Sequence, residues 1–384
     1  MPQGISISDD SRCWLALSRT QGLGHVGVRR LIARLGSVAE IFRASLTELE
    51  SVGVTAPAAQ SLALGASLKA ADEVLNGLEG RDLWLITPAS PEYPEPLANI
   101  YDPPMALYGR GAVEALSAPG IAVVGTRHPT PYGVGMAERL SCDLAARGLV
   151  IFSGLARGVD AAAHRGALQG RGRTVAIFGT GVDVVYPREN LKLAGMILDE
   201  GGALLSEFPL GQGPRPENFP IRNRIISGLS YGVLVGEAGE YSGTRITARC
   251  ALEQGREVFA IPGNVTNKLS WGPNTLIKQG AHLTATWEDL WEELPNDLRL
   301  RLQPIDKQGV EEKTPSLFGE GEGLQPKEKK LYACLRADEA TQIDELMSAL
   351  EGELSSAEVF SILFELELAG KIRQLPGKNY VRVF

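Results

Sequence analysis

Short apolar runs alternate with amphipathic stretches through the middle of the chain, from about residue 82 to residue 294. The amphipathic stretches, such as 133–147 and 244–254, predict helices, and Pro131 directly after Thr130 is typical of a helix start. Strands that are apolar throughout and separated by helices predict a parallel sheet covered on both faces. We therefore expect an α/β fold, an extended Rossmann-like doubly wound sheet, over residues 79–294. The predicted strands are Ile121–Gly125, Leu149–Ser153, Thr174–Phe178, Ala203–Ser206, Tyr231–Gly236 and Glu257–Ile261.

The first part of the chain, residues 1–78, has a helical pattern instead. Apolar residues recur at helical spacing between residues 10 and 75, and Ser45-Leu-Thr-Glu48 has the pattern of a capping box. Gly22-Leu-Gly24 and Val52-Gly53-Val54 resemble helix-hairpin-helix turns, whose backbone amides grip a DNA phosphate. A small packing module with glycines at its helix ends explains the same residues. Both interpretations of this helix-hairpin-helix or SAM-like module stay open.

The last part of the chain changes character twice. Residues 295–326 contain scattered prolines and a Gly/Glu cluster without an apolar period, which predicts a flexible linker. Residues 327–384 then predict three helices (327–336, 342–350 and 355–368) and two short strands around Pro376-Gly377, the pattern of a winged helix. The third helix carries Glu358, Glu365 and Glu367 but neither Lys nor Arg. We therefore expect this domain to make protein contacts rather than to read DNA grooves.

Bulk composition narrows the functional classes. The chain has 384 residues and a net charge of -8, which argues against coating nucleic acid by bulk positive charge but permits a local basic cleft. Its four cysteines are scattered and fit a reducing compartment. No signal peptide or membrane-spanning run is evident, so we expect a cytoplasmic protein with no membrane partner.

The loops that follow the predicted strands share one composition. Ligands bind beyond the carboxyl ends of the strands in an open parallel sheet. Glycines there let a backbone approach a ligand, hydroxyls donate to phosphate oxygens and arginines supply charge. Because the loops after successive strands all have this composition, together they predict a binding site for a large polyanion. They are Gly125-Thr-Arg127, Ser153-Gly-Leu-Ala-Arg-Gly-Val-Asp160, Gly179-Thr-Gly181 with Tyr186-Pro187, Phe208-Pro209 with the 219–224 run, Ser242-Gly-Thr244 and Pro262-Gly-Asn264.

The run Phe219-Pro-Ile-Arg-Asn-Arg-Ile-Ile-Ser-Gly-Leu-Ser230 is the most informative segment. A short helix over 221–229 would place Arg222, Asn223 and Arg224 at its mouth, where free N–H groups and guanidinium charge together favour phosphate. Phe219 has two open interpretations: it fills the core beneath the loop, or it is a platform on which an unpaired base stacks.

Familiar catalytic patterns are missing from the sequence. The first strand-to-helix turn does not give GxGxxG, and there is no Walker loop. The four histidines have no metal-binding spacing, and Asp160 is better explained as an N-cap or a loop brace than as a general base. We expect no cofactor, no metal and no catalytic residue.

Taken together, several segments resemble the DNA-processing protein A (DprA) family over residues 10–294 and again in the tail. The segments are Tyr93-Pro, Asp102-Pro-Pro, Leu107-Tyr-Gly, Gly125-Thr-Arg127, 153–160, 219–230, Ser242-Gly-Thr with Thr247-Ala248 and Gly255-Arg256, and Pro262-Gly with Gly272, Asn274, Leu276-Ile277 and Gly280-Ala281. Val159 stands where isoleucine is frequent in the family. The resemblance implies a homodimer that binds single-stranded DNA, protects it and delivers it to the RecA recombinase during natural transformation, without catalysing a reaction.

On this basis we predict which residues contact DNA. Arginines and a lysine would meet phosphates, glycine amides would line the path, and neutral side chains would donate hydrogen bonds. The predicted residues are Gly125, Thr126, Arg127, Ser153, Gly154, Arg157, Gly158, Phe219, Arg222, Asn223, Arg224, Ser242, Gly243, Thr247 and Lys278. A rival interpretation is a Rossmann-like nucleoside-monophosphate phosphoribohydrolase, which the segment 236–245 loosely resembles. Glu237 would then be its acidic catalytic group.

Overall fold

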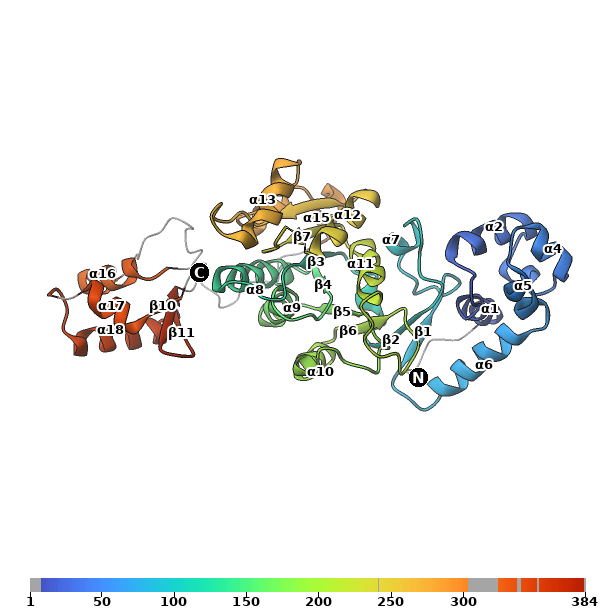
Figure 1. Ribbon diagram of the computed structural model, residues 1–384, viewed down its shortest axis with the longest axis horizontal. Coiled ribbons are helices and arrows are strands. Elements are labelled where there is room, and N and C mark those ends of the chain that lie inside the picture. Colours follow the sequence, from blue (N-terminus) through green and yellow to red (C-terminus); the bar gives the residue numbers. More distant parts are fainter. Residues whose placement is uncertain (1–7, 241, 303–323, 337–339, 351, 383–384) are drawn as a thin grey trace.

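The computed structural model describes residues 8–240, 242–302, 324–336, 340–350 and 352–382. Figure 1 shows a group of helices near the N-terminus, a central α/β body and a small C-terminal domain. No helix in these ranges is both long and apolar enough to cross a membrane.

The N-terminal module is helical, as predicted. Its helices are α1 (Asp9–Ser18), α2 (His25–Leu35), α3 (Val38–Ile41), α4 (Leu46–Ser51), α5 (Ala56–Ala63) and α6 (Ala66–Leu78). Ser45 and Glu48 form the predicted capping box at the start of α4. In the two glycine turns, Gly22 and Gly53 have φ values of 79° and 88°, a left-handed backbone that favours glycine. Leu23 and Val54 of these turns are buried in the module's own core, so the turns have a packing role. That they also grip a phosphate stays a prediction.

A nine-stranded sheet forms the central body, in the order β1-β2-β6-β5-β4-β3-β7-β8-β9. All six predicted strands are present and parallel: β3 (Gly120–Val124), β4 (Val150–Ser153), β5 (Thr174–Phe178), β6 (Ala203–Ser206), β7 (Gly232–Val235) and β8 (Glu257–Ala260). The chain adds strands outward from β3 to β6 and then returns to pair β7 with the other side of β3. The strand order therefore reverses between β3 and β7, which is where a doubly wound sheet opens a crevice.

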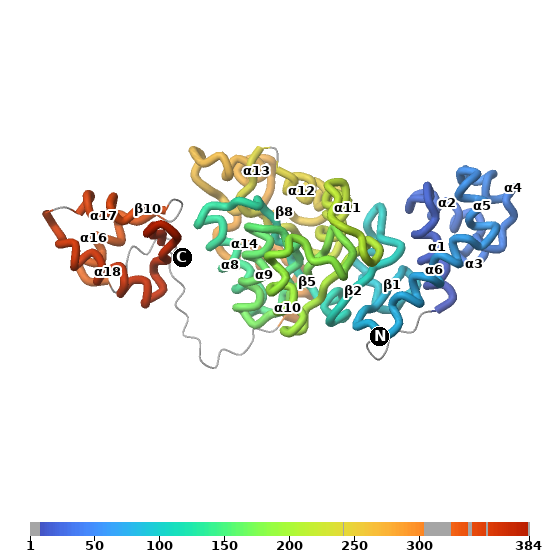
Figure 2. Tube along the Cα trace, turned by 60° about the horizontal axis from the view of Figure 1, so that its bottom comes forward, coloured from blue at the N-terminus to red at the C-terminus, as the bar shows by residue number. Residues whose placement is uncertain are grey.

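Helices cover both faces of this sheet. On one face lie α8 (Pro131–Ala145), α9 (Val159–Gln169) and α10 (Leu191–Asp199), and on the other lie α11 (Asn218–Leu229) and α12 (Thr244–Glu253). Figure 2 shows the same arrangement after a turn of the molecule. Thr130 caps α8 and Pro131 occupies its first turn, as predicted. The doubly wound Rossmann-like fold is thus confirmed.

Three strands were not predicted. β1 (Trp84–Ile86) and β2 (Leu107–Gly111) extend the sheet beyond β6 in antiparallel fashion, and β9 (His282–Leu283) ends the other edge. They are only two to five residues long and lie at or next to an edge of the sheet, so their apolar runs are brief. The short helices of this body are α7 (Glu95–Ala98), η1 (Val113–Leu116), η2 (Arg188–Asn190), η3 (Lys268–Ser270), α13 (Trp271–Lys278) and α14 (Trp287–Trp291).

The predicted linker was placed too early. Residues Asn296–Arg301 form α15, and the side chain of Leu298 is buried against the α8 side of the body together with Leu290 and Leu294. The sequence pattern did not indicate this helix, because it is only six residues long and has a proline on either side. Residues 303–323, which hold most of the predicted linker, lie outside the described residues.

The C-terminal domain is a winged helix, as predicted. It contains α16 (Pro326–Cys334), α17 (Ile343–Ala349) and α18 (Ser356–Leu368), with a three-stranded sheet of β10 (Thr341–Gln342), β12 (Asn379–Arg382) and β11 (Ile372–Leu375). One face of α18 is buried in the domain core, through Val359, Ile362, Leu363 and Leu366. β11 and β12 form the wing around Pro376-Gly377.

Candidate functional site

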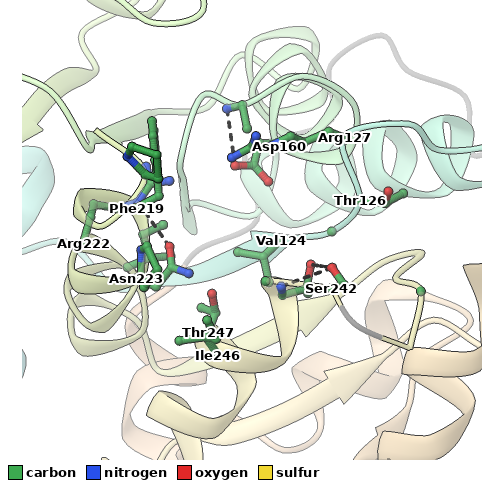
Figure 3. A pocket seen from close by; sticks show the side chains of 18 of the residues that line it. Val124, Thr126, Arg127, Asp160, Phe219, Arg222, Asn223, Ser242, Ile246 and Thr247 are labelled. Carbon is green, nitrogen blue, oxygen red and sulfur yellow. Dashed lines mark hydrogen bonds between the residues drawn. The ribbon is translucent and has the colours of Figure 1, made fainter. Parts of the chain in front are cut away.

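A pocket of about 850 Å³ lies at the point where the strand order reverses. It is formed by the loop after β3, the loop that leads into α12, and one face of α11 (Figure 3). Nine of the predicted site residues line it: Gly125, Thr126, Arg127, Phe219, Arg222, Asn223, Ser242, Gly243 and Thr247. The loops that the sequence predicted to converge therefore do converge, because the carboxyl ends of parallel strands share one edge of the sheet.

Arg127, Phe219 and Tyr186 form a cation–aromatic cluster on one side of the pocket. The guanidinium carbon of Arg127 lies 5.6 Å from the centroid of the Phe219 ring. The Tyr186 and Phe219 centroids are 5.8 Å apart, with the rings tilted by 43°. Phe219 is half-buried and Tyr186 is 42% exposed, so both rings keep accessible surface. Such a group offers a flat apolar surface beside a positive charge.

Arg127 is exposed, and no ion pair of its guanidinium occurs within the described part of the chain. Two other predicted arginines, which lie outside the pocket lining, differ in this respect. Arg157 pairs with Glu189 at 2.5 Å, and Arg224 is held by two carboxylates. Among the predicted arginines Arg127 is therefore the one whose charge is available to an incoming anion.

The amino end of α12 reaches the pocket from the other side. Ser242, Gly243 and Thr244 line the pocket at this end, followed one turn later by Thr247. The Ser242 hydroxyl donates to Thr244 Oγ1 at 2.9 Å and accepts from the Thr244 backbone N–H at 3.2 Å. A helix amino end with hydroxyl groups favours a phosphate, because the helix dipole attracts negative charge and hydroxyl groups can donate to phosphate oxygens.

Arg222 has a different environment from the one predicted. α11 begins at Asn218, three residues earlier than expected, so Arg222 and Arg224 lie in its second turn rather than at its mouth. The guanidinium of Arg222 is buried and donates to the carbonyl oxygens of Gly154, at 3.0 Å, and Ile177. Burial lowers the pKa of Arg222 to about 10, partly offset by Asp160, so the group is still charged at neutral pH. Arg222 therefore ties α11 to the ends of β4 and β5.

Arg224 points away from the pocket, because residues two apart on a helix do not share a face. Its Nε donates to Asp102 at 2.8 Å and its Nη2 donates to Glu207 at 2.6 Å. Burial alone would lower the pKa of Arg224, but Glu207 and Asp102 together raise it. Direct contact of Arg222 or Arg224 with phosphate stays a prediction, and their geometry favours a role in holding α11.

The remaining predicted residues lie outside the pocket lining. Ser153 is buried and donates to the Val123 carbonyl at 2.6 Å. Gly154 is crowded by the Arg222 guanidinium, so glycine is needed there for packing. Gly158 has a φ of 73°, and a Cβ on it would lie 2.4 Å from the Thr126 carbonyl oxygen, so it fits the two loops together. Lys278 is exposed at the end of α13.

Buried polar residues brace the loops of the pocket, and Asp160 among them is part of its lining. Asp160 accepts from the Ala156 N–H at 3.4 Å, the brace that the sequence suggested, although Gly158 is the N-cap. Burial raises the pKa of Asp160, and the positive charge of Arg222 counteracts this. His164 lies beneath it with its Nδ1 2.7 Å from Thr174 Oγ1. That hydroxyl donates to the Ile151 carbonyl, so the imidazole must supply the proton of the His164–Thr174 bond.

Glu237 is turned away from the pocket. The residue is 3% exposed, and its carboxylate accepts from the Thr130 N–H and hydroxyl, both at 2.6 Å, and from Asn267 Nδ2 at 3.2 Å. A Cβ at Gly133 would lie 2.4 Å from Glu237 Oε2, which shows how tightly α8 packs against it. A carboxylate committed to capping α8 is poorly placed to attack a glycosidic bond, which weighs against the phosphoribohydrolase interpretation.

Some lining residues were not predicted. Tyr186 and Ile246 line the pocket together with Pro214, Pro216 and Pro220. Tyr186 belongs to a predicted strand-end loop, and Pro214 and Pro216 lie in a segment without periodicity, so only the tertiary structure brings these three residues to Phe219. Within the described residues, no group of three or more His, Cys, Asp or Glu side chains is placed to hold a metal ion.

Comparisons with known proteins fit this geometry. Residues 84–295 match the family described as DNA recombination-mediator protein A, and residues 319–378 match the DprA winged helix domain. Protein Smf of Escherichia coli K12 is 40% identical over 385 residues, covering 97% of this chain and 96% of the relative. DNA processing protein DprA of Bacillus subtilis is 46% identical over 54% of this chain and 70% of its own length.

Two solved structures are similar as well. The X-ray structure of DprA from Streptococcus pneumoniae aligns with a TM-score of 0.65 at 34% identity, over 76% of this chain and 99% of that one. The structure of DNA processing protein A from Helicobacter pylori, which concerns its single-stranded DNA binding mode, aligns with a TM-score of 0.50 at 30% identity. It covers 55% of this chain and 94% of the other.

Proposed function

The chain belongs to the DNA recombination-mediator protein A family, and from this premise we propose that its pocket binds single-stranded DNA without sequence preference. The observation that carries the proposal is the Arg127–Phe219–Tyr186 cluster facing the amino end of α12 across one pocket. Aromatic rings stack on any base, and positive groups track any backbone, so this combination suits a ligand of arbitrary sequence.

The two sides of the pocket would contact different parts of the DNA strand. Arg127 and the α12 amino end, with Ser242, Gly243 and Thr247, would contact phosphates. Phe219 and Tyr186 would stack on a base, while Gly125, Thr126 and Asn223 line the path between them. Ser153, Gly154, Arg157, Gly158, Arg222 and Arg224 would act mainly by holding the loops and α11 in place. Lys278, on α13, would meet only a strand that extends beyond the pocket.

The bound strand would be delivered to RecA as part of natural transformation, in the cytoplasm and by a homodimer. Membership of a recombination-mediator family supports this part of the proposal. The Helicobacter pylori relative, whose structure concerns single-stranded DNA binding, supports the ligand class. A strand-exchange assay would test it: the protein should relieve the block that single-strand-binding protein imposes on RecA. Sedimentation velocity would test the dimer.

We propose a binding role rather than a catalysed reaction. The inward position of Glu237 supports this, because its oxygens already accept hydrogen bonds from Thr130 and Asn267. The direct experiment sets two readouts side by side. The full chain should retain a labelled oligothymidylate on a filter while releasing no free base from nucleoside monophosphates. Release of base that depends on Glu237, without retention of the oligonucleotide, would support the phosphoribohydrolase instead.

A further inference from the structure

The outward face of α18 in the winged helix is apolar. Phe360, Phe364 and Leu368 are spaced four residues apart and are 48%, 63% and 74% exposed. Successive positions on a helix are about 100° apart, so these three side chains form one stripe along two turns, about 12 Å long. The opposite side of α18 is already used for the domain core. Exposed large apolar side chains grouped in this way mark an interaction surface.

This stripe occupies the face that a DNA-binding winged helix would present to a base pair. Glu367 borders it on one side and Glu365 on the other, and α18 itself contains no Lys or Arg. Two lysines of α16 are already paired with carboxylates: Lys327 with Glu358 of α18 and Lys330 with Glu353, both at 2.5 Å. The cations of the wing begin at Lys371, beyond the end of the helix. An apolar stripe between carboxylates repels a phosphate backbone and suits a protein instead.

We propose that this face of α18 docks an amphipathic helix of a partner protein, with apolar residues on one side and Lys or Arg along both flanks. Phe360, Phe364 and Leu368 would be the anchors, in the manner of a helix that binds through residues at i, i+4 and i+8. Glu365 and Glu367 would select the basic flanks and oppose acidic ones. This role is separate from the DNA pocket and goes beyond the function proposed above.

Charge argues against two other occupants. A second copy of α18 would bring the same glutamates against Glu365 and Glu367. The chain's own segment 303–323 has two lysines (307 and 313) against five acidic residues (306, 311, 312, 320 and 322), a net charge of 2 − 5 = −3. Both therefore carry the same sign as the face they would cover.

The probe for the experiment is a fluorescein-labelled peptide of about 18 residues, long enough for several helical turns, with Leu on one side and Lys on the other. Its counterpart has every Lys replaced by Glu. Anisotropy titrations with the full chain should give at least about tenfold tighter binding of the Lys peptide. The double variant Phe360→Ser/Phe364→Ser should weaken that binding by about tenfold or more. Glu365→Lys/Glu367→Lys should remove the preference for the Lys peptide.

Leu191→Ser is the matched control, because Leu191 is also a surface leucine, 61% exposed, but lies on α10. It should leave peptide binding unchanged, and the serine variants should melt like the parent chain because the replaced side chains are exposed. Equal binding of the two peptides, or unchanged binding by the phenylalanine variant, would overturn the proposal. So would self-association of the chain that the same phenylalanine substitutions abolish, or a loss of duplex DNA binding in that variant.

Discussion

The guanidinium group of Arg222 fills the space that a side chain at position 154 would need. A Cβ placed on Gly154 would lie 2.5 Å from Arg222 Nη2 and 2.6 Å from Nη1. The same guanidinium donates to the Gly154 carbonyl, so the loop after β4 and helix α11 are fitted to each other at this point. α11 carries Phe219 and Asn223 into the pocket, and their position therefore depends on this contact between Arg222 and the loop after β4.

Gly154→Ala should consequently destabilise the protein. The added methyl group must displace a buried guanidinium, an overpacking change that costs about 1–3 kcal/mol. Gly195→Ala is the control: Gly195 lies within α10 with nothing within 4 Å of an added Cβ, and alanine should stabilise the helix by about 0.5–1 kcal/mol. Thermal melts of both variants measure the difference. Equal melting temperatures for the two would contradict the packing role of Gly154.

The sequence was sufficient to predict the sheet and the convergence of its loops, but not the direction of the α11 side chains. The helix was expected to start at Ile221, whereas it starts at Asn218 with Pro220 in its first turn, where a proline is tolerated because the N–H groups have no partner in the helix. Moving the start to Asn218 sends Arg222 inward and Arg224 toward Asp102. Composition identified both as cations near a phosphate site, and only the helix register shows which protein groups each guanidinium contacts.

The contact between Tyr186 and Phe219 and the helix around Leu298 could not be predicted, because no local sequence pattern indicates either of them. Tyr186 and Phe219 are 33 positions apart in the sequence and meet only because β5 and β6 lie side by side. Leu298 belongs to a six-residue helix between prolines, too short to show a period. The winged helix, in contrast, was predictable from its three regular helices and its wing.

Phe219→Ala should weaken binding of oligothymidylate by about 1–3 kcal/mol, because a stacking platform is lost. Phe219 is half-buried and packs near Gly179, so a moderate loss of stability should accompany it. Tyr186→Ala separates the two effects, since Tyr186 is 42% exposed and should lose affinity with little change in melting temperature. Binding isotherms and thermal melts of both variants, measured on the same preparations, separate a loss of affinity from a loss of stability. Normal affinity in both variants would rule out the stacking role.

The buried imidazole of His164 should make stability depend on pH. Burial, with smaller effects of Arg222 and Arg165, lowers the pKa of His164 to about 3, whereas an unfolded histidine titrates near 6.5. Below about pH 6.5 the unfolded state therefore binds a proton that the folded state does not, and stability falls as pH falls toward 3. At about pH 5 the loss from this group should approach 2 kcal/mol.

His164→Phe keeps a flat ring of similar size and removes the titration. The melting temperature of the parent chain should fall more steeply between about pH 7.5 and pH 5 than that of the variant. Carboxylates and His25 titrate in both proteins and cancel in the comparison. Parallel pH profiles would show that His164 does not stay neutral in the fold.

The winged helix should be dispensable for single-strand binding, provided that α15 is kept. Truncation after Leu302 preserves Leu298 in the core and should change affinity for oligothymidylate by less than about threefold, under 1 kcal/mol. Truncation after Pro295 removes that buried leucine and should cost about 1.5–3 kcal/mol of stability. Anisotropy titrations and melts of both truncated chains measure this. A tenfold affinity loss after truncation at Leu302 would place a DNA contact in the winged helix.

The most direct measurement is the salt dependence of binding to an oligothymidylate of about 20 nucleotides and to a duplex of the same length, for the full chain and for Arg127→Ala. The single strand should bind at least about tenfold tighter than the duplex. The slope of log K against log salt should fall by about 0.7 in Arg127→Ala, which loses one phosphate contact. It should stay unchanged in Arg249→Ala, whose arginine is 80% exposed on α12 outside the pocket. Equal affinity for duplex and single strand, or an unchanged slope in Arg127→Ala, would contradict the assignment of this pocket to single-stranded DNA.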